Sequence, residues 1–168
     1  QIPNLRVLIA GIGNLDDGVR AEIARRNLLE CVTLLGRRGD IPVLVSASNL
    51  MLLTSLVEGL PNAVMEAQWL ERPVVCSDAG DVRALVSDGL TGYVLPPNDI
   101  DGLVSAVIKI LSEPMLQVQM GKAGREHIKS SFSVDRMLDN SLALYGLAKS
   151  DSAPQSDNSD FRWTQGAI

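Results

Sequence analysis

The chain has 168 residues, 46% hydrophobic and 21% charged, which suits one globular domain with a buried core. A formal net charge of −5 argues against a broad basic footprint, so we expect no nucleic-acid partner. No apolar stretch approaches the roughly 20 residues of a membrane span, and Cys31 and Cys76, each within an apolar run, favour core thiols in a reducing, cytoplasmic setting.

Short apolar runs alternate with segments of helical pattern along the chain. The predicted elements, in chain order, are strand 5–11, helix 15–28, strand 31–36, helix 40–47, strand 50–55, a helix from Pro61, strand 72–77, helix 81–89, strand 91–97, and helices 99–113, 115–130 and 133–148. Asp40 is the expected N-cap of the second helix, Pro61 the expected first residue of the third, and Gly89 the expected end of the fourth. We therefore predict a domain over 1–148 and a polar, disordered tail over 149–168.

The alternation of strands and helices predicts an α/β fold with a doubly wound parallel sheet, covered by helices on both faces. In such folds, ligands bind at the carboxyl ends of the strands. This rule directs attention to the loops that follow Ala10, Leu35, Ser55, Ser77 and Leu95.

One of these loops carries the stretch EGLPNAVMEA, in which Glu58 and Glu66 lie on either side of a predicted helix start. The free N–H groups of a helix start attract anions such as phosphate, and Gly59 lets the backbone approach a ligand closely. A carboxylate can accept hydrogen bonds from vicinal sugar hydroxyls. The loop therefore indicates a nucleotide-sugar site, although two solvated surface acids would give the same spacing.

The stretch TSLVEGLPNAVMEAQWLERPVVCSDAGDVRALVSDGLTGYVLPPND, residues 54–99, resembles the carboxyl-terminal half of the family 4 glycosyltransferases of the GT-B fold. A Glu-x7-Glu motif after a strand ending in Ser, a strand of the PVV kind, a Gly-containing loop and a TG-x-V-PP segment occur in the order of that family. The resemblance extends over roughly 2–148. It implies a Rossmann-like domain that binds the sugar-nucleotide donor.

The resemblance implies a retaining enzyme of the hexosyltransferase type that uses no metal and no cofactor besides the sugar-nucleotide donor. Carried over by position, Glu58 is the catalytic residue and contacts the transferred sugar, while Glu66 holds the ribose. The other implied donor-binding residues are Gly36 and Arg37 beside the nucleobase and Gly59, Leu60, Pro61 and Asn62 near the sugar and phosphate.

The chain also departs from the family pattern. We expect the family's first strand, its Gly-rich turn with an Arg and a Lys that clamp the diphosphate, and the acceptor-binding amino-terminal domain to be absent from this chain. The isolated chain should then fold but transfer no sugar, and any contact with the inner face of the membrane would involve the absent domain. Asp81 replaces a usual Gly, and Glu71 replaces the Gly that often closes the motif helix, so we expect that helix to end differently.

Two alternatives remain beside the transferase. One is a Rossmann-like module that binds a nucleotide sugar without catalysis, and the other is a GT-B sugar-nucleotide epimerase. The epimerase would require a histidine in the cleft, and His127, the one histidine, is expected on the surface. A dinucleotide fingerprint at 11–18 is disfavoured because Asp16 stands at its third Gly position.

Overall fold

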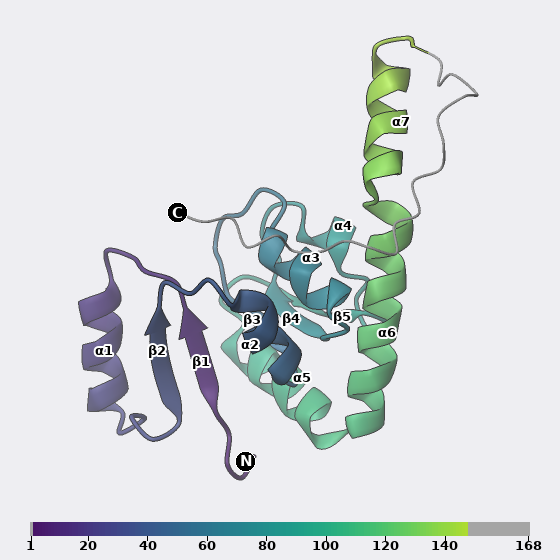
Figure 1. Ribbon diagram of the computed structural model, residues 1–168. Helices are drawn as coiled ribbons and strands as arrows, with labels where there is room; N and C mark the ends of the chain where they lie inside the picture. Colours follow the sequence, from purple (N-terminus) through teal and green to yellow (C-terminus); the bar gives the residue numbers. More distant parts are fainter. Residues whose placement is uncertain (1, 148–168) are drawn as a thin grey trace. The chain divides into compact units, whose positions relative to one another are not determined.

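The computed structural model of the chain describes residues 2–147 (Figure 1). The chain forms two compact units, Gln1–Phe132 and Ser133–Ile168, and each is considered by itself. The tail predicted for 149–168 lies outside the described residues, so its disorder stays a prediction.

Every predicted strand and helix has a counterpart in the structure, with ends that differ by a few residues. The first unit contains β1 (Val7–Ala10), α1 (Asp16–Arg25), β2 (Val32–Gly36), α2 (Ile41–Ala47), β3 (Met51–Leu53), α3 (Asn62–Trp69), β4 (Val74–Ser77), α4 (Val82–Leu85), β5 (Gly92–Leu95), α5 (Ile100–Ser112) and α6 (Pro114–Ser131). The second unit contains α7 (Val134–Leu144).

All strand pairs are parallel, as predicted, but the strands form two sheets instead of one. β1 pairs with β2, and β4 lies between β3 and β5. Within residues 2–147, β1 and β3 each keep one edge without a hydrogen-bonded neighbour. β1 is also poorly covered, because Leu8 and Ile9, which alternate between its two faces, are 50% and 41% exposed. The single sheet that was predicted is thus divided between β1 and β3, since no described strand forms hydrogen bonds with both of them.

The β3–β5 sheet is covered on both faces, as a doubly wound fold requires. Successive side chains of a strand point to opposite faces, and all four residues of β4 are buried. Val74 and Cys76 pack into one cluster with residues of α3 and α4, whereas Val75 packs into a second cluster with residues of α5 and α6. The predicted α/β architecture is thus confirmed around β4.

Helix α3 ends in a way that the sequence analysis did not predict. Glu71 adopts the left-handed conformation, with φ 59°. Its N–H donates to the carbonyl of Gln68 at 3.0 Å, and the N–H of Arg72 donates to that of Ala67 at 2.8 Å. This pair of bonds is a Schellman motif. The expectation that Glu71 would change the helix end was wrong, because these two bonds hold a non-glycine residue in the glycine conformation.

Packing against α6 supports the same end of α3. A methyl group at Gly121 of α6 would lie 2.1 Å from the carbonyl oxygen of Glu71, so only glycine permits this approach. Arg125 of α6 pairs with the Glu71 carboxylate at 3.2 Å and lies over the Trp69 ring, 5.3 Å from its centroid. The helix that carries Glu66 is therefore anchored at its carboxyl end.

Two predicted helix boundaries need correction, and a third is right but lacks the expected capping bond. Asp40 occupies the N-cap position of α2, but its carboxylate makes no capping bond; it accepts two hydrogen bonds from Arg38, at 2.8 and 2.6 Å. Pro61 is the N-cap of α3 and not its first helical residue. Helix α4 ends at Leu85, and Gly89 lies beyond it in a turn, with φ 76°.

The remaining helices follow their sequence signals. Asp99 caps α5 by accepting a hydrogen bond from the N–H of Gly102 at 2.9 Å. In the second unit, Ser133 caps α7 through the N–H of Arg136 at 3.2 Å. Among the helices of residues 2–147, none combines the length and the apolar character that crossing a membrane requires.

Candidate functional site

Glu58 and Glu66, the two acids of the motif, lie in the elements predicted for them. Glu58 is in the loop that leads from the carboxyl end of β3 to α3, and Glu66 is in the middle of α3. Both side chains are partly buried. Neither carboxylate accepts a hydrogen bond or forms an ion pair within residues 2–147, whereas Asp78 is paired with Arg83 at 2.9 Å. Two partly buried carboxylates are thus available for the donor hydroxyls of a ligand.

The residues between these acids form a mostly exposed loop and the start of the helix. Gly59, Leu60 and Asn62 are exposed, and only Pro61 is buried. The preceding side chains are also open to solvent, since Leu56 and Val57 are 66% and 87% exposed. These exposed apolar side chains beside two unpaired acids form a surface that a ligand or a further protein segment could cover.

A neighbouring loop, which follows Ser77 and was among the loops expected near a ligand, supports the motif loop. The hydroxyl of Ser77, the last residue of β4, donates to the carbonyl of Ser55 at 2.5 Å. Asp81, at the end of the same loop, donates its N–H to the carbonyl of Gly59 at 2.9 Å. The sequence indicated this loop only by its position, because it follows β4, the strand adjacent to β3.

The predicted nucleobase residues lie at the carboxyl end of β2, in the other sheet. Gly36 has φ 64°, and its carbonyl accepts from the N–H of Gly11 at 2.8 Å. Arg37 is exposed and has no partner among the described residues, while Arg38 is held by Asp40. Gly36 lines a small cavity of about 60 Å³ together with Gly11 and residues of α1. The two halves of the predicted site therefore belong to different sheets of one unit.

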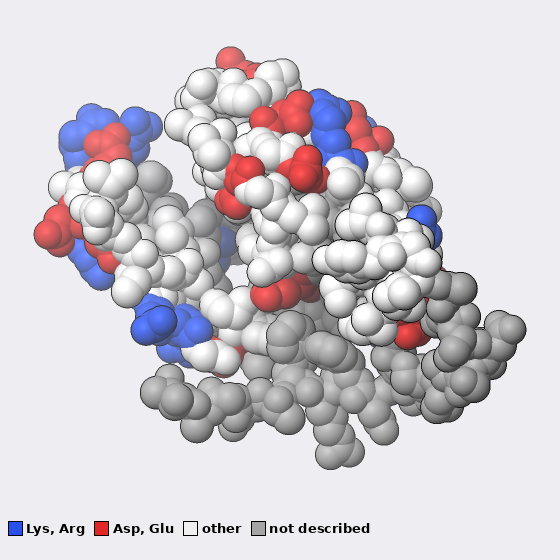
Figure 2. All heavy atoms as spheres, turned by 90° about the horizontal axis from the view of Figure 1, so that it is seen from above, with Lys and Arg blue, Asp and Glu red and all other residues white. Residues whose placement is uncertain are grey.

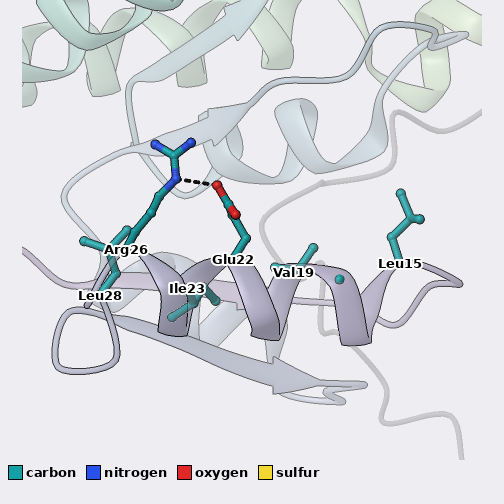
Figure 3. A pocket seen from close by; sticks show the side chains of 7 residues that line it. Leu15, Val19, Glu22, Ile23, Arg26 and Leu28 are labelled. Carbon is teal, nitrogen blue, oxygen red and sulfur yellow. Dashed lines mark hydrogen bonds and ion pairs between the residues drawn. The ribbon is translucent and has the colours of Figure 1, made fainter.

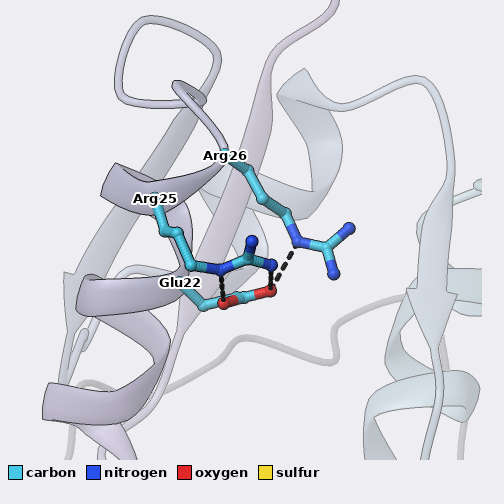
Figure 4. A network of polar contacts seen from close by, with 3 residues as sticks. All are labelled: Glu22, Arg25 and Arg26. Carbon is cyan, nitrogen blue, oxygen red and sulfur yellow. Dashed lines mark hydrogen bonds and ion pairs between the residues drawn. The ribbon is translucent and has the colours of Figure 1, made fainter.

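A larger open cavity of about 310 Å³ lies along α1 and contains none of the predicted site residues (Figure 3). Its labelled lining side chains are Leu15, Val19, Glu22, Ile23, Arg26 and Leu28. Glu22 accepts hydrogen bonds from Arg25 and Arg26 (Figure 4). These bonds, first from Arg25 and then from Arg26, lower the pKa of the Glu22 carboxyl to about 2. The charged residues that line this cavity, Glu22 and Arg26, are thus paired with each other.

Charge and metal-binding residues were surveyed over the same part of the chain. Figure 2 shows Asp and Glu side chains interspersed with Lys and Arg on the face drawn, with no continuous basic area among its described residues. Within 2–147, no three His, Cys, Asp or Glu side chains lie close enough to hold a metal ion. The absence of a metal from the reaction stays a prediction.

His127 lies at the surface, as expected, but its ring is packed against neighbouring residues. The side chain is partly buried. Its Nε2 lies 2.9 Å from the carbonyl oxygen of Ala84, and its ring meets that of Phe132 edge-on at 6.0 Å. The histidine that an epimerase would need is therefore engaged in packing α6 against α4.

The comparisons with known proteins agree with this fold. A family model described as "Glycosyl transferases group 1" matches residues 1–127, and the chain belongs to this family. An Escherichia coli protein, the UDP-Gal:alpha-D-GlcNAc-diphosphoundecaprenol alpha-1,3-galactosyltransferase, is 32% identical over 145 residues, which are 86% of this chain and 37% of that protein. The chain thus spans a little over a third of the length of the curated relatives that it matches first.

Solved structures show the same fold. A point mutant of S. aureus TarM, crystallised with fondaparinux, alpha-GlcNAc-glycerol and UDP, has a TM-score of 0.78 at 25% identity, over 83% of this chain and 29% of its own. Anabaena HepE in complex with UDP-glucose has a TM-score of 0.79 at 24% identity, over 87% of this chain and 42% of its own. The resemblance to GT-B glycosyltransferases and the Rossmann-like α/β fold are confirmed.

Proposed function

We propose that this chain is the donor-binding domain, the carboxyl-terminal half, of a retaining glycosyltransferase that transfers a hexosyl group from a sugar nucleotide to an acceptor. The observation that carries the proposal is the pair of partly buried, unpaired carboxylates, Glu58 and Glu66, on either side of the start of α3. The name of the E. coli relative includes UDP-Gal, and TarM was crystallised with UDP, which favours a UDP-type donor.

Each part of the site has a role in this proposal. Glu66 accepts hydrogen bonds from the two ribose hydroxyls, and Glu58 accepts them from the transferred sugar. The backbone N–H groups of Gly59, Leu60 and Asn62 bind the phosphates at the start of α3, while Pro61, which has no N–H, shapes the loop. Gly36 and Arg37 border the nucleobase. These groups and the helix start offset the diphosphate charge, so the proposed reaction needs neither a metal nor another cofactor.

The unpaired edges of β1 and β3 support a further part of the proposal. In a doubly wound fold the chain winds outward in two directions from a central strand. β1 and β2 run outward on one side, and β3, β4 and β5 run outward on the other. We propose that one more parallel strand, outside these 168 residues, pairs with both free edges, and that an acceptor-binding domain accompanies it.

Without that strand and domain, the 168-residue chain should bind a nucleotide but transfer no sugar. Catalysis requires donor and acceptor to be held in register, and such positioning supplies many kcal/mol of barrier reduction. Robust turnover by the purified chain would contradict this division of labour. A cytoplasmic location stays a prediction that the structure does not bear on.

Calorimetric titration of the chain with UDP and GDP tests the proposed site. Glu66→Ala should weaken binding of the preferred nucleotide by about 1.5–3 kcal/mol, because charge-assisted hydrogen bonds to the ribose are lost. Glu30→Ala is the matched control, since Glu30 is exposed and precedes β2 at the amino ends of the strands. EDTA should leave the wild-type affinity unchanged. Equal affinities of the Glu66→Ala and Glu30→Ala proteins would remove Glu66 from the site.

A further inference from the structure

At Gly80, the loop after β4 lies so close to the loop after β3 that a side chain would collide with it. This residue has φ 57°, a conformation that favours glycine. A methyl group at Gly80 would lie 2.1 Å from the carbonyl oxygen of Glu58 and 2.5 Å from that of Gly59. Both distances are far inside van der Waals contact and involve backbone atoms, which cannot move aside as a flexible side chain could. Only glycine allows this approach.

Hydrogen bonds hold the two loops together on each side of Gly80. The N–H of Asp81 donates to the carbonyl of Gly59 at 2.9 Å, and the hydroxyl of Ser77 donates to the carbonyl of Ser55 at 2.5 Å. The carbonyls of Glu58 and Gly59 therefore both face the loop 77–81.

The orientation of these carbonyls fixes the direction of the next two amides. The described residues contain no cis peptide bond, and in a planar trans peptide the N–H points opposite to the C=O. The N–H groups of Gly59 and Leu60 therefore point away from the loop 77–81. Neither donates a hydrogen bond to any residue within 2–147.

We propose that Gly80 and Asp81 are positioning residues for the donor site, Gly80 through its lack of a side chain and Asp81 through its backbone N–H. They set the two peptide planes after Glu58, so that the amides of Gly59 and Leu60 face the anionic group of the donor. The link to the donor rests on the proposed function, whereas the link to the peptide planes does not. Asp81 serves this role through its backbone, which explains how it stands where the family has a glycine.

Two alanine variants of the 168-residue chain separate this role from general strain. Gly80→Ala and Gly89→Ala both place alanine at positive φ, but a methyl group at Gly89, with φ 76°, meets no atom within 4 Å. The readouts are the NMR signals of the Gly59 and Leu60 amides and the affinity for UDP. Gly80→Ala should shift both signals and weaken UDP binding about tenfold, and Gly89→Ala should leave both near wild type.

The outcomes distinguish the two proposals. Amide signals that shift in Gly80→Ala alone, in a chain that binds no UDP even as wild type, would uphold the positioning role and sink the proposed function. Equal signals in the two variants, or shifted signals with unchanged UDP affinity, would overturn the positioning role. Should Gly80→Ala not fold, Ser77→Ala adds no atoms and should move the same amide signals less; an unchanged spectrum would then contradict the inference.

Discussion

The side-chain amide of Gln68 donates to the hydroxyl oxygen of Thr91 at 3.0 Å, and both side chains are almost completely inaccessible to solvent. The same hydroxyl oxygen accepts from the N–H of Ser87 at 3.0 Å. The bond links α3, the helix that carries Glu66, to the turn before β5. The Oε1 atom of Gln68 is buried without a hydrogen-bond partner among the described residues.

Thr91→Val should therefore destabilise the domain by about 2–3 kcal/mol, because it leaves two donors without their acceptor while keeping the side-chain shape. Gln68→Met should change stability by less than about 1 kcal/mol, since it removes an unpaired buried oxygen as well as a bonded amide. Urea unfolding of the two variants measures both values. If Gln68→Met lowered the free energy of unfolding more than Thr91→Val, the hydrogen bonds to the Thr91 hydroxyl would not be the main link between α3 and the turn before β5.

Glu71 provides a test of backbone strain at the end of α3. Glu71→Gly and Glu71→Ala both remove the exposed ion pair with Arg125, which contributes at most about 1 kcal/mol. Only glycine relieves the left-handed conformation, so the Gly variant should be more stable than the Ala variant by about 1 kcal/mol. Thermal unfolding of the pair gives this difference. Equal melting temperatures of the Gly and Ala variants would mean that the left-handed conformation at position 71 carries no strain.

Cys76 makes stability depend on alkaline pH. Burial, and next the charge of Asp78, raise the pKa of this thiol from 9.0 to about 12. The folded chain thus keeps a proton that the unfolded chain loses above pH 9. The stabilisation is complete below pH 9 and is lost as the pH rises from 9 towards 12.

Between pH 8 and 10, wild type should lose about 1 kcal/mol more unfolding free energy than Cys76→Val. Denaturant unfolding at the two pH values provides the comparison. An identical pH dependence in wild type and Cys76→Val would contradict the role of the buried thiol.

The parts of the fold that depend on local pattern could be predicted from the sequence. The β4 strand was found because Val74, Val75 and Cys76 form an apolar run between turn residues. The α3 start was found, within one residue, from Pro61. The split between β1 and β3 was not predicted, because an apolar run shows that a strand is buried but not which strand it pairs with.

Side-chain competition and close backbone approach explain the other differences. Asp40 was expected to cap α2, but Arg38 two residues earlier offers a two-point ion pair that binds its carboxylate instead. Glu58 and Glu66 could be proposed from their spacing within an ordered family pattern, and their roles stay a prediction. The contact of Gly80 with the carbonyl of Glu58 could not, because it joins loops that follow two different strands.

The most direct test of the central claim compares the affinity of the 168-residue chain for a UDP-hexose and for UDP alone. Glu58→Gln keeps the shape of the side chain and removes its charge. If Glu58 contacts only the transferred sugar, this variant should bind the UDP-hexose about tenfold more weakly and UDP as wild type does. Glu66→Ala should weaken the binding of the UDP-hexose and of UDP to the same extent. Equal losses for the two ligands in Glu58→Gln, or no loss for either, would contradict the assignment of Glu58 to the sugar.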